Sequence, residues 1–304
     1  MDSIATSPRK PISLSKVSLL TALGIWLGSL LTGCASAPVS ATLAQGIIWQ
    51  VDADHVRPTG DWDKLGVSNL LVQWTAVDNT AYVSDAGLPT AKRLPDWEAL
   101  SRAPWANRVI VGLAGNFDEK HAREHVSQLG EQSRQLAASH PPVRIDGWYF
   151  PVEVDPTWKD APTIVRWLNA LPRPLWISVY DNTNIGGKAL AEWLDGWLPH
   201  DVGIFWQDGC GLYARDAAAA REYADALSAR LGKGRVRIIA EAFRPRQGGG
   251  FRPATAQELL PQLNAYRGYS IYLFDGPHYV SSDLVKTLLG SSEKGSTAHS
   301  AEAK

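Results

Sequence analysis

Short apolar runs alternate with amphipathic segments along most of this chain. Eight runs rich in Val, Ile, Trp and Tyr are bounded by Gly, Pro, Asn or Asp, a pattern typical of buried β-strands. The expected strands are Ile47–Asp52, Asn69–Trp74, Arg108–Ala114, Gly147–Glu153, Leu175–Asp181, Val202–Asp208, Val236–Glu241 and Ser270–Asp275.

The segments between these strands have the periodicity of helices. The clearest are Asp118–Ala138, Thr163–Leu171, Lys188–Leu198, Asp216–Leu231 and Thr255–Tyr266, with two weaker ones near Asp61–Leu65 and Pro95–Ala103. Strict strand–helix alternation favours a parallel sheet, and eight units favour a single (β/α)₈ TIM barrel of the α/β class over residues 46–290. An open doubly wound sheet is the alternative, but no Gly-x-Gly-x-x-Gly follows the first strand.

Both ends of the chain differ in composition from this barrel. Residues 1–33 have a basic start, an apolar run over 17–31 and a small-residue motif ahead of Cys34, which indicates a lipoprotein signal peptide. An ordinary secretory signal and a membrane anchor are the alternatives, although the run is shorter than the roughly 20 residues of a spanning helix. Residues 34–45 are expected to be a tether, and residues 291–304 a disordered tail.

A lipid on Cys34, diacylglycerol with palmitate, would place the protein in the cell envelope. Because Ala35 rather than Asp follows Cys34, we expect an outer-membrane lipoprotein that faces the periplasm. The formal net charge of −1 gives no support to a nucleic-acid surface. Cys210 would then be the only other cysteine, and with no metal-ligand spacing of Cys and His we expect no metal and no cofactor.

Polar side chains gather where the predicted strands end. Glu153 closes the fourth strand and Glu241 the seventh, and strand ends form the mouth of a barrel. Two carboxyl groups at this mouth suggest the acid/base and nucleophile of a glycosidase. A separation of roughly 5–5.5 Å would imply retention, and roughly 6.5–9.5 Å inversion.

The same strand ends supply candidate sugar-binding residues. Amide and carboxylate groups would bind hydroxyls, while aromatic rings would pack on the C–H face of a sugar. The candidates are Gln50, Asp52, Gln73, Trp74, Tyr180, Gln207, Asp208 and Phe243. Strand-end Asp residues also begin loops or cap helices, which is an equally good interpretation for Asp181, Asp208 and Asp275, and the aromatic residues could belong to the core.

Alternation along the strands predicts which side chains face the barrel axis. Tyr149, Pro151 and Glu153 share one face of the fourth strand, while Ile239 and Glu241 share one face of the seventh. A bulge at Pro151 would disturb the first of these assignments.

Four segments resemble an uncharacterised family of secreted bacterial glycoside-hydrolase-like TIM barrels. They are Gly147–Asp155 (GWYFPVEVD), Leu175–Asn182 (LWISVYDN), Gly203–Gly209 (GIFWQDG) and Ile238–Pro245 (IIAEAFRP). More distantly, the chain is similar to the clan-A retaining glycosidases, which implies acid/base and nucleophile roles for Glu153 and Glu241. That clan typically has Asn before its acid/base, whereas this chain has Val152.

Three functions follow from these patterns. The first is a glycosidase that acts on an envelope or extracellular polysaccharide. The second is a non-catalytic lipoprotein that binds carbohydrate in the same cleft, and the third is a structural envelope protein that uses the barrel as a scaffold.

Overall fold

The computed structural model describes residues 42–139 and 141–302 of the chain. The predicted signal peptide, Cys34 and most of the predicted tether lie outside these residues. Within the described residues, no helix combines the length and the apolar composition needed to cross a membrane.

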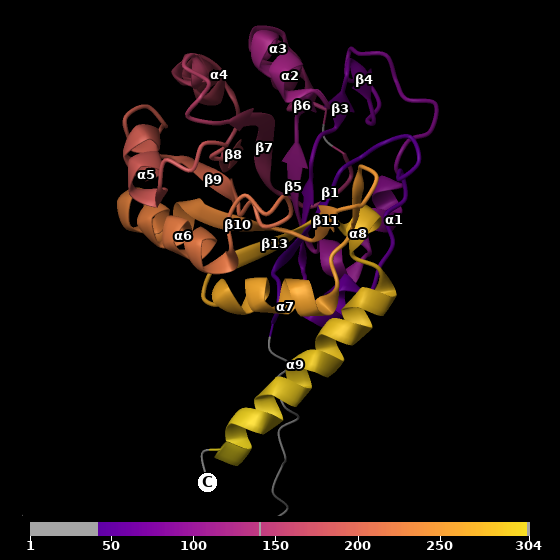
Figure 1. The fold of residues 1–304 in the computed structure, drawn as a ribbon. Coiled ribbons are helices and arrows are strands. Elements are labelled where there is room, and N and C mark those ends of the chain that lie inside the picture. The colour runs from indigo at the N-terminus through magenta and orange to yellow at the C-terminus, as the bar shows by residue number, and fades with distance from the viewer. Residues whose placement is uncertain (1–41, 140, 303–304) are drawn as a thin grey trace, which may run out of the picture. The chain divides into compact units, whose positions relative to one another are not determined.

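Eight parallel strands close into a barrel in sequence order, which confirms the predicted fold class (Figure 1). The strands are β1 (Gly46–Trp49), β2 (Asn69–Val72), β5 (Arg108–Gly112), β7 (Ile145–Val154), β8 (Leu175–Val179), β9 (Val202–Gln207), β10 (Val236–Glu241) and β13 (Ser270–Phe274). Closure is made by β1, which pairs with β2 on one side and with β13 on the other. The first and last strands of the barrel, distant in sequence, are therefore neighbours.

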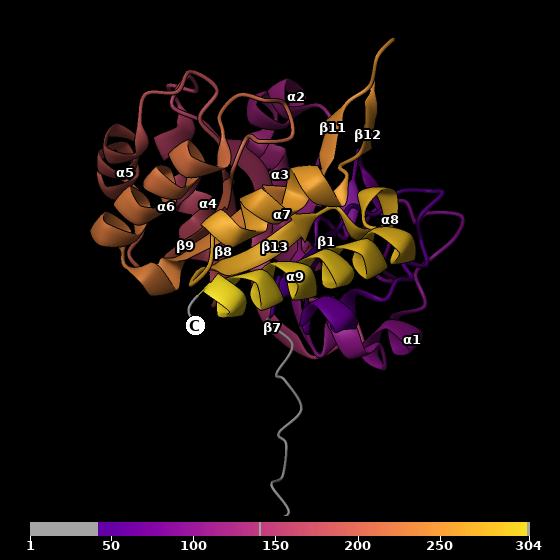
Figure 2. The same ribbon diagram turned by 60° about the horizontal axis from the view of Figure 1, so that its bottom comes forward.

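Helices follow the strands around the barrel. They are α1 (Trp97–Ser101), α2 (Glu119–Glu124), α3 (Val126–Leu136), α4 (Val165–Ala170), α5 (Gly187–Asp195), α6 (Ala217–Leu231), α7 (Ala256–Ala265), α8 (Gly276–Tyr279) and α9 (Ser282–Glu302). Figure 2 shows α7 beside α9, and the two helices are in contact. Short 3-10 helices occupy Trp62–Leu65, Pro104–Ala106, Ala161–Ile164 and Lys233–Arg235.

Small strands lie outside the barrel sheet. β3 (Ala76–Val77), β4 (Thr80–Ala81) and β6 (Ala114–Gly115) form one small sheet, while β11 (Phe243–Pro245) and β12 (Phe251–Pro253) form an antiparallel hairpin. This hairpin carries the glycine run Gly248–Gly250 at its tip and projects from the barrel in Figure 2.

Two predicted segments differ from the structure. The helix expected over Asp118–Ala138 is two helices, because His125 ends α2 and begins α3 with a non-helical ψ of 19°. The tail expected to be disordered from Ser291 instead continues α9 to Glu302. Leu284, Val285 and Leu288 are buried at the start of α9, and extending an existing helix costs much less than starting one.

The side chains of the strands form two separate apolar layers. Each barrel strand contributes one residue to an inner cluster, which consists of Ile48, Leu71, Ile110, Tyr149, Trp176, Phe205, Ile239 and Tyr272. Alternate residues such as Phe150 and Ala240 face the helices in the outer layer. Glycines make room for the largest inner rings, since a Cβ at Gly203 would lie 2.2 Å from the Trp176 ring.

Pro151 coincides with an irregularity in β7, as the sequence suggested. Phe150 pairs with Ile177 of β8, and the next paired residues are Glu153 and Ser178. The strand thus carries extra residues at its end, which is the arrangement of a β-bulge. Bulges re-aim side chains near the rims of barrels, and here Pro151 and Glu153 both line a cavity at the mouth.

Candidate active site

A cavity of about 150 Å³ lies at the carboxyl ends of the barrel strands. Five predicted site residues line it together: Gln50, Gln73, Trp74, Glu153 and Gln207. They come from the ends of β1, β2, β7 and β9, so the barrel brings together side chains that are far apart in sequence. Tyr149 and Ile239 of the inner cluster also line this cavity.

Glu153 is held by an amide and a guanidinium. Gln207 Nε2 donates a hydrogen bond to Glu153 Oε2 and another, of 2.7 Å, to Ser178 Oγ. Arg123 Nη2 lies 3.6 Å from Glu153 Oε1. Burial raises the pKa of Glu153, while the hydrogen bond from Gln207 and the charge of Arg123 act in the opposite direction. The net result is a raised pKa for a carboxyl group that Gln207 and Arg123 contact.

Glu119 is a cavity residue that the sequence did not single out. It is the first residue of α2, and its Oε2 accepts a 3.2 Å hydrogen bond from the backbone N–H of Glu153. Burial and the nearby charge of Glu153 raise the pKa of Glu119 to about 8. An acidic residue in the first turn of a helix interacts favourably with the helix dipole, which gives Glu119 a structural explanation of its own. No sequence pattern linked it to Glu153.

Glu241 ends β10 in a more enclosed place. The residue is 4% exposed, and its Oε2 accepts a 2.6 Å hydrogen bond from the backbone N–H of Gly211. Burial and the charges of Asp208 and Glu153 raise its pKa to about 8, against the effect of Gly211 and Arg215. Glu153 and Glu241 thus interact electrostatically, but Glu241 is not among the residues that line the cavity.

Glycine is required at position 211 for this contact. A Cβ there would lie 2.7 Å from Glu241 Oε2 and 2.6 Å from the ring of Phe243. The predicted sugar-binding residue Phe243 is itself 8% exposed and packs against Phe251, Phe274 and Tyr279. The structure therefore places Phe243 in an aromatic cluster beside Glu241 and outside the cavity lining.

Asp208 is fully buried at the end of β9. Its carboxylate accepts hydrogen bonds from Cys210 N at 3.1 Å, from the Tyr266 hydroxyl at 2.9 Å and from Gln262 Nε2. It also accepts one from the backbone N–H of Glu241 at 3.3 Å. These contacts tie β9 to β10 and α7, and they support the structural interpretation of this strand-end aspartate.

Tyr180 and the other strand-end aspartates have different surroundings. The half-buried Tyr180 ring lies beneath the guanidinium of Arg215, whose Cζ is 5.2 Å from the ring centroid. Asp181 is buried and accepts hydrogen bonds from the backbone N–H groups of Thr183 and Ile185. Asp275 caps α8 through a 2.9 Å hydrogen bond from His278 N. Asp181 therefore orders the loop after β8, whereas Asp275 caps a helix.

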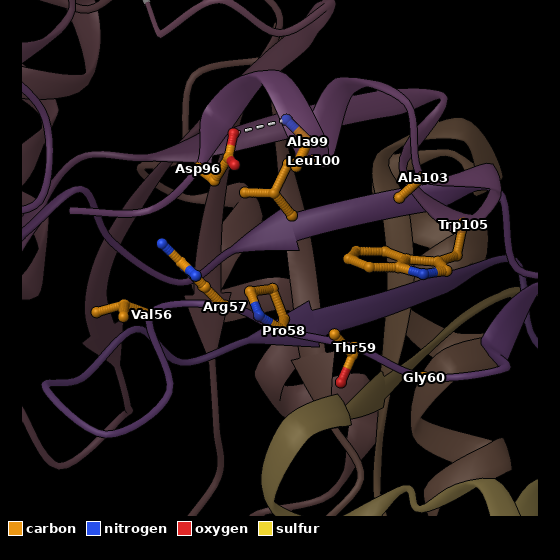
Figure 3. A pocket seen from close by; sticks show the side chains of 10 residues that line it. All are labelled: Val56, Arg57, Pro58, Thr59, Gly60, Asp96, Ala99, Leu100, Ala103 and Trp105. Atoms are coloured by element: carbon orange, nitrogen blue, oxygen red, sulfur yellow. Dashed lines mark hydrogen bonds between the residues drawn. The ribbon is translucent and has the colours of Figure 1, made fainter. Parts of the chain in front are cut away.

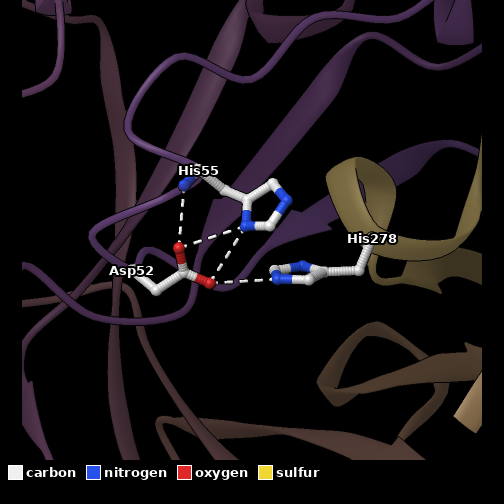
Figure 4. Close-up of side chains that lie close together, drawn as sticks. All are labelled: Asp52, His55 and His278. Atoms are coloured by element: carbon white, nitrogen blue, oxygen red, sulfur yellow. Dashed lines mark hydrogen bonds and ion pairs between the residues drawn. The ribbon is translucent and has the colours of Figure 1, made fainter.

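Asp52 lies with two histidines rather than in the cavity (Figure 4). Its Oδ1 and Oδ2 are each 3.1 Å from His55 Nδ1, and Oδ2 is also 3.0 Å from His278 Nε2. Both histidine rings converge on the one carboxylate, with ring centroids 3.9 Å apart.

Several concavities of the described residues are larger than the Glu153 cavity, among them a groove and a pocket. A groove of about 920 Å³ is lined by Arg123, Trp158 and Arg166 among others, and it adjoins the site because Arg123 also contacts Glu153. A pocket of about 360 Å³ lies between residues 56–60 and the segment 96–105, where Trp105 forms one wall (Figure 3). None of its lining residues is a predicted catalytic residue.

Comparison with known proteins extends the description of the fold. The chain matches no protein-family model and no curated protein. Its structure is similar to that of a "putative alpha-L-fucosidase" from Bacteroides thetaiotaomicron, with a TM-score of 0.58 and 16% sequence identity. The match covers 88% of this chain and 97% of that one. At this identity the likeness shows a TIM-barrel fold and does not carry over a reaction.

Proposed function

We propose that this chain is a glycoside hydrolase, with Glu153 as acid/base and Glu241 as nucleophile. The observation that carries the proposal is the cavity at the strand ends, where Glu153 meets Gln50, Gln73, Gln207 and the Trp74 ring. Barrel enzymes place their chemistry at this face. The fold of the Bacteroides protein supports a carbohydrate substrate without identifying the sugar.

The lining of the cavity suits a sugar ring. Four amide side chains, those of Gln50, Gln73, Asn116 and Gln207, offer donors and acceptors for hydroxyl groups. Among the described residues, Gln73 Oε1 has no hydrogen-bond partner. A buried acceptor without a partner is costly, so a hydroxyl donor from a ligand would stabilise it. At about 150 Å³ the cavity is smaller than the roughly 300–1,000 Å³ of sites for drug-sized ligands, which favours a single sugar unit.

The rest of a polysaccharide would occupy the groove next to this cavity. Arg123 connects the two, since it lines the groove and contacts Glu153 of the cavity. Trp158 offers an aromatic surface there, with the Arg123 guanidinium 5.7 Å from its ring centroid. A glycan could therefore place one unit at Glu153 and continue along Trp158.

The two roles are those that the resemblance to the clan-A retaining glycosidases implies. Glu241 attacks the anomeric carbon as a carboxylate, and Glu153 gives its proton to the departing glycosidic oxygen as that bond breaks. Water, deprotonated by Glu153, then releases the sugar from Glu241. The first step requires the ionised form of Glu241. The N–H of Gly211 and the charge of Arg215 favour that form, but burial and the charge of Asp208 outweigh them and raise the pKa of Glu241 to about 8, so this step is expected to be faster at alkaline pH.

A non-catalytic carbohydrate-binding protein is the second candidate. The confinement of Glu241 favours it, because this carboxyl group is bonded to Gly211 and does not line the cavity. In that case Glu153 and the amides would bind hydroxyl groups without cleaving the glycan.

The cellular setting of the proposal depends on residues 1–45. A lipid on Cys34 would anchor the barrel in the outer membrane, facing the periplasm, close to an envelope or extracellular polysaccharide. A nucleic acid is not a proposed partner. Labelling of intact cells with a palmitate analogue, with and without Cys34→Ala, tests the anchor.

A glycan panel distinguishes the candidate functions. We expect the wild-type protein to release sugar from at least one glycan, and Glu153→Gln and Glu241→Gln to bind that glycan without cleaving it. Binding without turnover by the wild type would support the second candidate. The absence of any tryptophan-fluorescence response across the panel would contradict both and leave the barrel as a scaffold.

A further inference from the structure

We propose that Asp52, His55 and His278 form a binding site for one divalent transition-metal ion, with Asp275 orienting His278. The three side chains come from the loop after β1 and from α8, which follows β13 (Figure 4). Closure of the barrel makes these two segments neighbours although Asp52 and His278 are 226 residues apart. That separation explains why no ligand spacing is visible in the sequence.

The donor atoms have the spacing of a small coordination shell. One carboxylate oxygen of Asp52 lies 3.1 Å from His55 Nδ1 and 3.0 Å from His278 Nε2. Zinc–nitrogen and zinc–oxygen bonds are about 2.0–2.2 Å, so neighbouring ligand atoms of a tetrahedral site are separated by about 3.3 Å. Only small movements would be needed to accept an ion between these atoms.

Asp275 supplies the support that histidine ligands of metals usually have. Its carboxylate is fully buried, lies 2.8 Å from His278 Nδ1 and accepts hydrogen bonds from the backbone N–H groups of Gln50 and His278. A carboxylate on one ring nitrogen fixes the tautomer, so that the other nitrogen faces the metal. His278 Nε2 accordingly points to Asp52, away from Asp275.

Charge and exposure also fit a cation. Two carboxylates flank one imidazole, while His55 and Asp52 remain partly exposed, with side-chain exposures of 37% and 26%. Imidazole and carboxylate ligands together suit zinc and related ions. Three protein ligands would leave a coordination position for water or another group, as in zinc sites that are not purely structural.

The chain contains its own control for this proposal. Among the described residues, one other group could hold an ion, His121, Glu124 and His125 on and next to α2. All three of these side chains are exposed, and no buried carboxylate is bonded to either histidine ring. Loss of His125 should therefore not affect the proposed site.

The test uses the purified full-length protein after treatment with EDTA and dialysis. Zinc chloride is titrated calorimetrically, and bound zinc is counted by elemental analysis. We expect one zinc ion per chain, an affinity reduced at least 100-fold in His278→Ala, and an unchanged affinity in His125→Ala. Asp275→Asn is expected to reduce it by about 10–100-fold, which is the usual effect of removing a supporting partner.

Two results would overturn the proposal: a wild-type protein that binds no zinc, or zinc binding that is lost in His125→Ala and kept in His278→Ala. Circular dichroism of each variant shows whether it is folded. Should His278→Ala unfold, His55→Ala in the partly exposed loop provides the same comparison. Glycan cleavage does not enter this test, so its outcome is independent of the proposed function.

Discussion

The ends of β7 and β10 each carry a glutamate at the mouth of the same barrel, but their surroundings differ. Glu153 lines an open cavity and is held by side chains, Gln207 and Arg123. Glu241 is 4% exposed and is held by a backbone N–H, that of Gly211. The barrel determines the edge of the sheet at which a residue lies, whereas the loops determine whether a ligand can reach it.

The largest expected effect is the loss of catalysis when Glu153, at the end of β7, is replaced. We expect Glu153→Gln to reduce the turnover of a cleaved glycan by about 10²–10⁴-fold, since it removes general acid–base catalysis. Sugar release under saturating substrate is the measurement. Glu98→Gln, on the exposed face of α1, is the matched control and should retain full activity. Full activity in Glu153→Gln would show that β7 does not supply the acid/base.

At the end of β10, we expect Gly211→Ala to displace Glu241, because the added Cβ would lie 2.7 Å from Glu241 Oε2. Overpacking of this kind costs about 1–3 kcal/mol in the free energy of unfolding. Urea denaturation measures this loss, and sugar release should fall with it if Glu241 is the nucleophile. Gly234→Ala is the control, because nothing lies within 4 Å of a Cβ at that position. Equal stability of the two variants would contradict the described packing.

Glu241, at the end of β10, should also make the stability of the protein depend on pH. The pKa of Glu241 is raised to about 8, so the folded protein holds this proton more tightly than the unfolded chain. Its stabilising contribution is complete below the ordinary pKa of 4.5 and is lost as the pH rises through about 8. We expect the free energy of unfolding to decrease less from about pH 5 to about pH 8.5 in Glu241→Gln than in the wild type. Parallel curves would contradict the raised pKa.

The smallest expected effect on turnover is that of replacing Glu119, which is hydrogen-bonded to the backbone of Glu153. Glu119 accepts a hydrogen bond from the Glu153 backbone and has a pKa raised to about 8, so it influences the charge at the β7 end. We expect Glu119→Gln to change turnover by less than about 10-fold and to shift the pH–rate profile, because general acid–base groups titrate in that profile. A loss as large as that of Glu153→Gln would instead make Glu119 a catalytic partner of Glu153.

Much of the architecture was predictable from the sequence because it depends on local patterns. The strand predicted over Val236–Glu241 has those bounds in the structure, and alternation placed Tyr149 and Ile239 in the inner cluster. The suspicion of a bulge at Pro151 is confirmed by the register of β7 with β8. In each case the feature is determined by residues that are close together in the sequence.

The candidate site was predictable only in part. Strand ends identified Glu153 and four other cavity residues, since parallel strands end on one side. The approach of Glu119 depends on how α2 begins after the preceding loop, and the enclosure of Glu241 depends on the loop that contains Gly211. The meeting of His55 with His278 requires the closed barrel. The roles of Glu153 and Glu241 stay predictions.

The residues that line the base of the Glu153 cavity are also part of the innermost packing of the barrel. Tyr149 and Ile239 belong to both, so the shape of the binding pocket and the stability of the fold depend on the same atoms. Truncation of a buried Ile to Ala costs about 2–5 kcal/mol, which is a large share of the 5–15 kcal/mol that holds a typical protein folded. Evolution or design toward a bulkier sugar would therefore have to proceed by changing the rim loops.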